Sequence, residues 1–515
     1  MKLISMLLHS ERDNLHHDCI VTKDYHYTRK EVISSVSHLI DDLRSRGVQK
    51  GNKVIVIFEH DELGVFFLAA ASAMGLHLLM PYNLSSATID EWINFTNEVQ
   101  YDFVVYLKKD RHFVGKLKEN NINVIDISDH KIRVSDDTAE IPMITYSPQS
   151  IANFIVLFTS GSTGKPKAIS ISESLVCRRI YSVTEKLKFT QGAKIFMSGL
   201  LNNTTGVIFS FGSLLHQSTL FIPEDRNVER WPDYLSRNKI THIMLRPESM
   251  KLFVKSTAEH NIDLSCLQVV AYGAAAMPPS VLEKGRQLIG CEWVQGYGLS
   301  ETYGPFCWVD EQDHRDKRYL NSIYCVGKID NTLEVAVKPI IGSSDNIGEI
   351  ILRGESIMEG YYDVLSGEIT SPDEWFVTGD LGYIDEEGYL ILKGRKQNTF
   401  MSANGHRIYP EEVESILSRI PNVNVATVVG FSFHENGVAI DQPVACMSGE
   451  ISKKSLAEIE DIISSFLMSK LSREKWPDWF YVTDEYFPKS HNDKILKSEL
   501  IKSIDPKKLF TLRNQ

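Results

Sequence analysis

The chain has 515 residues, of which 43% are hydrophobic and 24% are charged, and its formal net charge is −12. This length and composition predict a globular protein of two or more domains and exclude a largely disordered or fibrous one. The acidic balance also argues against general nucleic-acid binding, which needs an excess of Lys and Arg to neutralise phosphates.

The cysteines and the apolar segments favour a cytoplasmic protein without a membrane span. Seven cysteines lie far apart with no Cys-x-x-Cys pair, which indicates reduced thiols rather than disulfides or a zinc site. The most apolar run, residues 65–80, is interrupted by Ser72, Gly75 and His77. It is shorter than the roughly 20 apolar residues of a membrane span. We expect a buried helix that is capped near Gly75 and followed by a core strand.

The first 320 residues alternate β-branched or aromatic runs with segments of helical period. The expected strands are 53–58, 102–107, 122–127, 154–158, 219–222, 242–245 and 267–272. Such alternation predicts an α/β fold with layers of mostly parallel sheet and helices. Ligands of these sheets bind beyond the carboxyl ends of the strands.

In the rest of the chain the pattern of expected strands and helices changes twice. Between about 323 and 394, close-set strands at 333–337 and 348–352 and a hairpin turn at 385–388 predict a small β-rich subdomain. From 398 to 515, helices at 410–419 and 455–469 mix with strands at 423–430 and 443–447. We therefore predict a large domain at 1–394, a connection at 395–397 and a small, mobile α+β domain at 398–515.

One loop carries the first chemical signal, because it follows the strand expected at 154–158. It combines two glycines with hydroxyls and cations: Thr159, Ser160, Gly161, Ser162, Thr163, Gly164, Lys165 and Lys167. Small residues, hydroxyl donors and positive charge are what a polyphosphate needs. The loop is not a Walker P-loop, since Thr159 stands where that motif has glycine. By itself it is equally typical of a flexible Gly/Ser turn.

Five ordered segments together resemble the adenylate-forming (AMP-binding) superfamily, which joins acyl- and aryl-CoA synthetases, peptide-synthetase adenylation domains and beetle luciferase. The segments are 154–167, 295–302, 378–380, 394–397 with 405–414, and 488–497. The resemblance covers essentially the whole chain. It implies activation of a carboxylic acid by ATP and Mg²⁺ through an acyl-AMP, with CoA or a pantetheinylated carrier protein as the acceptor.

The resemblance also implies a role for each motif residue. Lys494 is the catalytic lysine, Thr302 contacts the α-phosphate, Glu301 holds Mg²⁺, Asp380 and Arg395 reach the ribose, and Gly273, Ala274, Ala275, Gly296, Tyr297 and Gly298 surround the adenine. These roles suit the chemistry. Cations offset the charge that gathers when a carboxylate attacks a phosphate, Mg²⁺ favours oxygen ligands, and a carboxylate can accept from both ribose hydroxyls.

In this superfamily the small domain rotates between the two half-reactions. Gln397 occupies the hinge position, and Gly405 and Arg407 belong to the face that serves thioester formation. Two positions depart from the pattern, because Gln397 replaces the usual Asp or Lys and Asp493 replaces the glycine before the catalytic lysine. The second departure points to slower adenylation.

The acid pocket is expected around Asn202, Asn203 and Gly206, together with Gly273 and Gly298. No acidic residue occurs between 194 and 223, which disfavours an α-amino acid because its buried ammonium needs an anionic partner. An aryl or fatty acid is favoured, although the two asparagines are equally typical of a polar turn. CoA is favoured over a separate carrier protein, while a non-catalytic nucleotide-binding protein and a luciferase-like oxygenase stay open.

Overall fold

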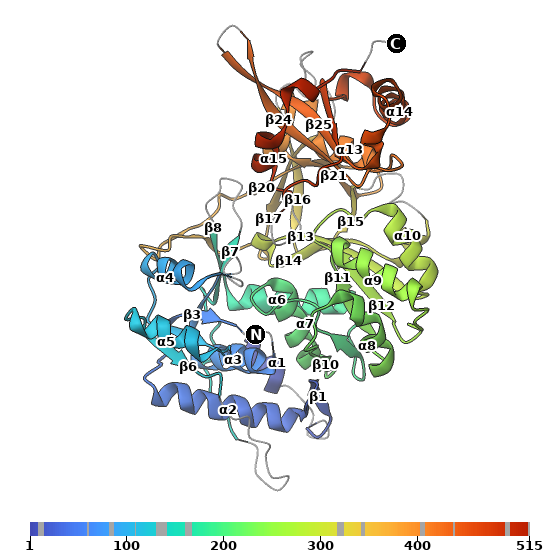
Figure 1. The fold of residues 1–515 in the computed structure, drawn as a ribbon. Helices are drawn as coiled ribbons and strands as arrows, with labels where there is room; N and C mark the ends of the chain where they lie inside the picture. Colours follow the sequence, from blue (N-terminus) through green and yellow to red (C-terminus); the bar gives the residue numbers. More distant parts are fainter. Residues whose placement is uncertain are drawn as a thin grey trace. The chain divides into compact units, whose positions relative to one another are not determined.

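A computed structural model describes residues 1–8, 15–58, 61–81, 87–108, 110–129, 142–159, 167–316, 324–340, 346–401, 407–435, 438–489 and 495–512. The chain divides into two compact units (Figure 1). Unit 1 comprises Met1–Asn321, Val326–Val335 and Leu352–Phe376, and unit 2 comprises Ser322–Cys325, Ala336–Ile351 and Val377–Gln515. The division passes through the segment that we expected to be a β-rich subdomain, and its strands are shared between the two units.

The first sheet of unit 1 has the strand order β19-β18-β8-β7-β4-β3-β5-β6. Its strands are β3 (Lys53–Ile57), β4 (His77–Met80), β5 (Phe103–Tyr106), β6 (Val124–Asp126), β7 (Ile155–Thr159), β8 (Lys167–Ile171), β18 (Gly360–Tyr362) and β19 (Ile369–Thr370). Strands β3 to β7 pair in parallel, whereas β8, β18 and β19 add an antiparallel side. The parallel strands place their carboxyl ends, including that of β7, at one edge.

Helices accompany this sheet where the sequence supplies caps and apolar faces. They are α1 (Leu3–Leu8), α2 (Arg29–Ser45), α3 (Glu62–Met74), α4 (Ile89–Asn97), α5 (Arg111–Glu119) and α6 (Glu173–Lys186). Helix α3 is buried nearly throughout and ends at Gly75, whose left-handed φ of 77° suits a residue without a Cβ. The expected helix and the core strand after it are confirmed as α3 and β4.

The second sheet of unit 1 runs in the order β15-β14-β13-β12-β11-β9-β10-β1-β2. Its strands are β1 (Asp18–Val21), β2 (His26–Thr28), β9 (Lys194–Phe196), β10 (Thr219–Phe221), β11 (His242–Leu245), β12 (Val269–Gly273), β13 (Glu292–Leu299), β14 (Gly304–Val309) and β15 (Cys325–Ile329). The strands from β1 to β13 within this order pair in parallel. A cluster that includes Phe196, Phe253 and Trp293 forms its core.

The helices of this second half are α7 (Thr204–Leu215), α8 (Trp231–Asn238), α9 (Pro247–Glu259), α10 (Pro279–Leu288) and α11 (Glu311–Arg315), with the 3₁₀ turn η4 (Ser300–Thr302) after β13. Helices α6 and α7 pack side by side in the middle of unit 1, between its two sheets (Figure 1). The layered α/β architecture with mostly parallel sheets is therefore confirmed.

Unit 2 holds the strand order β16-β17-β20-β21 and, farther along the chain, the three-stranded sheet β24-β25-β26. The bounds are β16 (Glu334–Pro339), β17 (Gly348–Arg353), β20 (Phe376–Ile384), β21 (Tyr389–Arg395), η5 (Lys396–Asn398), β22 (Phe400–Met401), β23 (Arg407–Ile408), α13 (Pro410–Leu417), β24 (Val425–Glu435), β25 (Val438–Ser448), α14 (Leu456–Met468), β26 (Trp479–Thr483) and α15 (Lys497–Ser503). The predicted hairpin turn at 385–388 joins β20 to β21, where Asp385 accepts hydrogen bonds from the backbone of Glu387 and Tyr389.

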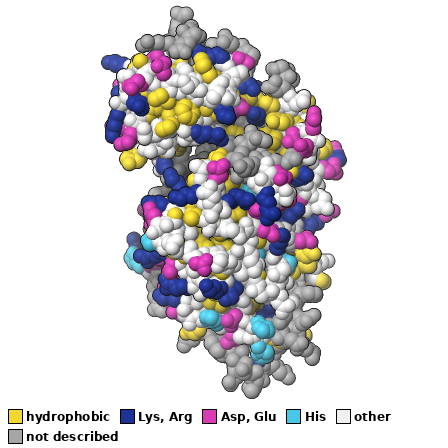
Figure 2. Space-filling model, turned by 90° about the vertical axis from the view of Figure 1, so that its right-hand side faces the viewer, with side chains coloured by type: hydrophobic (Ala, Val, Ile, Leu, Met, Phe, Trp, Pro, Cys, Tyr) yellow, Lys and Arg dark blue, Asp and Glu magenta, His cyan; other side chains and the backbone are white. Residues whose placement is uncertain are grey.

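Two surface properties bear on partners. Among the described residues, no helix is long and apolar enough to cross a membrane. On the face seen in Figure 2, Lys and Arg side chains are interspersed with Asp and Glu. The described side chains on this face therefore carry both signs of charge.

Candidate active site

Three predicted motifs of unit 1 leave strands at carboxyl ends. The loop after Thr159 follows β7, the segment from Gly273 to Met277 follows β12, and η4 follows β13. Strands β12 and β13 are parallel neighbours, with Gly273 opposite Gly296. The predicted adenine segment and the predicted metal motif therefore emerge at the same edge of one sheet, where α/β sheets bind ligands.

Close backbone packing explains the glycines at this edge. A Cβ at Gly273 would lie 2.3 Å from the carbonyl oxygen of Gly296, and a Cβ at Gly298 would lie 2.1 Å from that of Gly304. Any side chain there would force neighbouring strands apart. Ala274, the residue after Gly273, is exposed. Its backbone adopts a left-handed φ of 70°, which is sparsely populated for alanine.

The phosphate loop itself lies largely outside the described residues. Thr159 ends β7, whereas Ser160, Gly161, Ser162, Thr163, Gly164 and Lys165 are not described. The loop's last cation, Lys167, begins β8 opposite Thr159. Its ammonium stands 5.1 Å from the centre of the Tyr361 ring, within the range of a cation–π interaction.

Glu301 and Thr302 sit in η4, which lies beside β8. The Thr302 side chain is fully buried, and its hydroxyl lies 2.7 Å from the carbonyl oxygen of Gly304 and accepts from the Leu299 backbone N–H at 3.0 Å. This hydroxyl closes its own turn, so its contact with the α-phosphate stays a prediction. Tyr297, the expected adenine neighbour, is half-buried and meets the Phe306 ring at 5.3 Å and 62°.

The predicted ribose residues form an ion pair within unit 2. Strands β20 and β21 place Asp380 opposite Arg395, and the Arg395 Nε donates to Asp380 Oδ1 at 2.9 Å. A second Arg395 nitrogen donates to the Thr378 carbonyl at 2.9 Å, while the Thr378 hydroxyl accepts from the Asp380 backbone N–H at 3.0 Å. Asp380 is buried, and a paired, pre-oriented carboxylate of this kind retains lone pairs for hydroxyl donors.

The two candidate asparagines of the acid pocket differ in what their side chains do. Asn203 is the N-cap of α7, and its Oδ1 accepts from the Gly206 backbone N–H at 3.2 Å. Asn202 is buried, and its Oδ1 has no hydrogen-bond partner among the described groups. Buried polar atoms are normally paired, so only Asn202 presents an unsatisfied group.

The other predicted residues lie in unit 2 or outside the described part. Gln397 lies in η5, and Arg407 in β23 donates to the Thr399 hydroxyl at 2.6 Å. Gly405 and Lys494 lie outside the described residues. On the described flank of Lys494, the Lys497 ammonium donates to Glu414 Oε1 at 3.0 Å and to the Val428 carbonyl at 2.9 Å.

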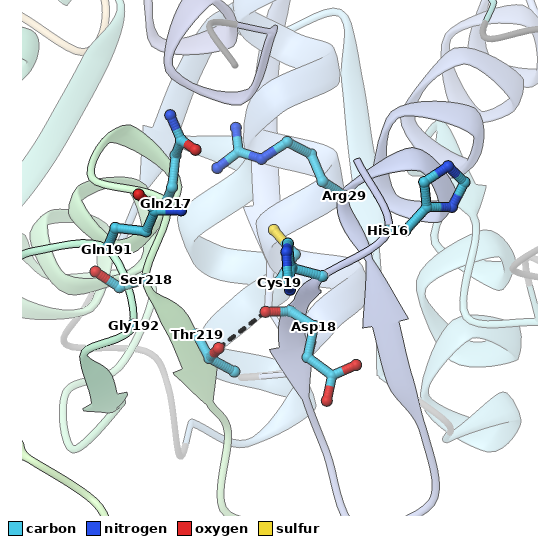
Figure 3. A pocket seen from close by; sticks show the side chains of 10 residues that line it. His16, Asp18, Cys19, Arg29, Gln191, Gly192, Gln217, Ser218 and Thr219 are labelled. Atoms are coloured by element: carbon cyan, nitrogen blue, oxygen red, sulfur yellow. Dashed lines mark hydrogen bonds between the residues drawn. The ribbon is translucent and has the colours of Figure 1, made fainter. Parts of the chain in front are cut away.

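Two cavities lie away from these motifs. One, of about 450 Å³, is lined by residues that precede or begin β1, β9 and β10, such as Asp18, Gly192 and Thr219. There the Thr219 hydroxyl donates to the Asp18 carbonyl at 2.9 Å (Figure 3). The other, of about 620 Å³, includes His77 and Ile151, which begin β4 and precede β7. Both open at amino ends of parallel strands, so neither is the candidate site.

The sequence reasoning missed Tyr361. Its strand, β18, pairs with β8, and the backbone N–H of Met358, shortly before that strand, donates to the Glu301 carbonyl of η4. No local motif points to it, since a Gly-Tyr-Tyr strand is typical of any half-buried sheet. Only the strand pairing could have placed its ring beneath Lys167.

Known proteins resemble this chain in sequence and in fold. The family model described as AMP-binding enzyme matches residues 9–362. The 2-succinylbenzoate–CoA ligase of Bacillus subtilis is 23% identical over 93% of this chain and 94% of its own length. The indoleacetate–CoA ligase of Aromatoleum aromaticum is 26% identical over 67% of this chain and 66% of its own length.

Among solved structures, the O-succinylbenzoate coenzyme A synthetase of Bacillus subtilis, in complex with ATP and magnesium ion, is similar with a TM-score of 0.78 and 22% identity. The match covers 97% of this chain and 98% of that one. Because the family model covers more than half of the sequence, this chain belongs to the AMP-binding enzyme family.

Proposed function

We propose that the protein activates a carboxylic acid with ATP and transfers the acyl group to the thiol of CoA. In the first step a carboxylate oxygen bonds to the α-phosphorus and the bond to the departing pyrophosphate breaks. In the second step the thiol sulfur bonds to the acyl carbon, the thiol proton is lost, and AMP leaves. The observation that carries this proposal is the family match together with chain-long likeness to CoA ligases.

The nucleotide roles rest on residues that suit them chemically. Asp380, which is oriented by Arg395, would accept hydrogen bonds from ribose hydroxyls. Glu301 offers a carboxylate beside the strand that follows the phosphate loop. One protein carboxylate fits Mg²⁺, which takes its other ligands from phosphate and water. Bound there, the ion would neutralise phosphate charge, and Lys494 would supply a cation for the transition state.

We further propose an aryl or fatty acid as the substrate rather than an α-amino acid. The absence of acidic residues between 194 and 223 leaves that segment without a partner for a buried ammonium. The unsatisfied Oδ1 of Asn202 would accept from a neutral donor, such as a ring hydroxyl or amino substituent, at small electrostatic cost. Asn202 is thus the residue that we expect to select among acids.

The second half-reaction would use the small domain beyond Gln397, with Gly405 and Arg407 on the face toward the thiol. Glycine at 405 would let a pantetheine arm pass close to the backbone. Seven free cysteines fit a reducing compartment such as the cytoplasm. A pantetheinylated carrier protein is the other acceptor that offers the same thiol chemistry.

The test is acid-dependent exchange of pyrophosphate into ATP, run with a panel of aryl, fatty and amino acids. We expect exchange with members of the first two groups and AMP release on addition of CoA. An absence of exchange with the entire panel would rule out the adenylation reaction. AMP release with pantetheinylated carrier proteins but not with CoA would replace the proposed acceptor.

A further inference from the structure

The short strand β18 and the residues just before it contact two predicted elements of unit 1. These are β8, which follows the phosphate loop, and η4, which carries the predicted metal ligand. Strand β18 pairs with β8 through Gly360 opposite Ser170 and Tyr361 opposite Ile169. The backbone N–H of Glu359 donates to the Ser170 carbonyl at 2.9 Å. The strand therefore runs along β8, which Lys167 begins.

The residue just before that contact ties the same segment to the metal motif. The backbone N–H of Met358 donates to the carbonyl oxygen of Glu301 at 2.7 Å. Residues 358–362 thus hold the end of the phosphate loop and the η4 turn together by backbone hydrogen bonds.

The Tyr361 side chain lies at this junction. Its ring faces the Lys167 ammonium at 5.1 Å. Burial raises the pKa of its hydroxyl, and the nearby Glu301 carboxylate raises it further. The Tyr361 ring therefore contacts one residue expected to meet MgATP, Lys167, and its segment is hydrogen-bonded to the backbone of the other, Glu301.

We propose that Tyr361 is a positioning residue for MgATP, because its ring fixes the place of the Lys167 ammonium relative to the Glu301 carboxylate. This inference rests on the proposed function. A lysine has a long, flexible stem and loses conformational entropy when it is held for a phosphate. The ring holds the ammonium before MgATP binds, because the face of an aromatic ring attracts a cation. Less conformational entropy is then lost on binding. Tyr361 would lower the dissociation constant of MgATP and leave the chemical step unchanged.

The experiment compares Tyr361→Leu with Tyr361→Phe. The leucine removes the ring, whereas phenylalanine keeps it and removes only the hydroxyl. We expect Tyr361→Leu to raise the dissociation constant of MgATP and the KM for ATP about 3- to 10-fold, from the strength of a partly exposed cation–π pair. The kcat of pyrophosphate exchange should change less than about twofold, and Tyr361→Phe should restore binding to within about twofold.

The matched control is Tyr362→Leu. Tyr362 is the next residue of the strand and is buried in a hydrophobic core cluster. Its ring has a separate cation–π contact, with the Lys53 ammonium at 5.9 Å. Its replacement should lower thermal stability and leave MgATP affinity unchanged. If Tyr361→Leu does not fold, Tyr361→Ile replaces it, because isoleucine suits a strand and also removes the ring, and the same rise in the dissociation constant is expected.

The outcomes separate the two proposals. A wild-type protein that binds no MgATP would overturn the proposed function and this inference with it. A wild type that binds MgATP, together with a folded Tyr361→Leu variant of equal affinity, would overturn this inference alone. Equal losses in Tyr361→Leu and Tyr361→Phe would assign the effect to the hydroxyl and overturn the role of the ring.

Discussion

At the residue scale, Asp380 is buried and its carboxylate accepts from Arg395 Nε at 2.9 Å. Its backbone N–H donates to the Thr378 hydroxyl at 3.0 Å. The carboxylate is therefore already oriented before a ligand arrives, which lowers the cost of binding. A turn aspartate would instead accept from backbone N–H groups a few residues away, as the half-buried Asp385 does in the same hairpin.

We predict that Asp380→Asn raises the KM for ATP about 10-fold or more, the order of a hydrogen bond to a charged group. The substitution keeps the shape and removes the charge that both Arg395 and the ribose would use. Steady-state pyrophosphate exchange measures the KM. Glu386→Gln, an exposed carboxylate in the same hairpin, is the control and should leave it unchanged. An unaltered KM in Asp380→Asn would contradict the ribose assignment.

The Asn203 side chain is already engaged as the N-cap of α7. Its Oδ1 caps α7, so we predict that Asn203→Ala lowers the free energy of unfolding of unit 1 by about 1 kcal/mol, a typical cap contribution. Asn203→Ser should retain most of that stability. Denaturant unfolding measures the difference. A large change in the KM for the acid with unchanged stability would instead make Asn203 a substrate residue.

At the scale of elements, one buried carboxylate links helix α1 to other parts of unit 1. Glu173 of α6 is fully buried, accepts from the Leu3 backbone N–H at 3.0 Å and lies 3.4 Å from the Lys2 ammonium. It also accepts from the Ser72 hydroxyl of α3 and from the Ile151 backbone N–H at 3.3 Å. Three helices, α1, α3 and α6, and the approach to β7 therefore meet at this side chain.

We predict that Glu173→Gln destabilises unit 1 by about 3 kcal/mol, because it leaves the buried Lys2 ammonium without its counter-ion. Thermal unfolding of the variant against Glu185→Gln, an exposed glutamate of the same helix, measures the effect. Equal melting temperatures for the two variants would show that the buried pair contributes nothing to stability.

At the scale of the whole molecule, the proposal of two half-reactions on two faces of the small domain makes opposite predictions for two residues. Lys494→Ala should slow pyrophosphate exchange about 100-fold or more, since one charge-stabilising donor is worth that much in a transition state. Transfer from a supplied acyl-adenylate to CoA should be largely retained. Equal loss in both assays would argue against separate faces.

Gly405→Leu should have the reverse effect. Its side chain would obstruct the pantetheine arm, so thioester formation should fall while pyrophosphate exchange stays near the wild-type rate. Because exchange requires a folded protein with a working nucleotide site, it serves as the internal control. An unchanged rate of thioester formation would remove Gly405 from the thiol face.

Local sequence determined much of this architecture. The strands expected at 53–58, 219–222 and 242–245 appear as β3, β10 and β11, because β-branched runs between helical segments are largely a local signal. The left-handed cap at Gly75 and the hairpin after Asp385 were also predictable, since glycine and aspartate suit those backbone conformations. Motif order alone led to the family that the comparison confirmed.

Long-range pairing decided the rest. Sequence could not tell that Asn203 caps a helix while its neighbour Asn202 is left with an unsatisfied oxygen, because that depends on where the chain turns into α7. Nor could it place Tyr361 under Lys167, since those residues are far apart in the chain and meet only when β18 pairs with β8. The sequence by itself determined which chemistry the chain carries, and the tertiary structure decided which side chains meet, because strand pairing brings distant segments together without a local signal.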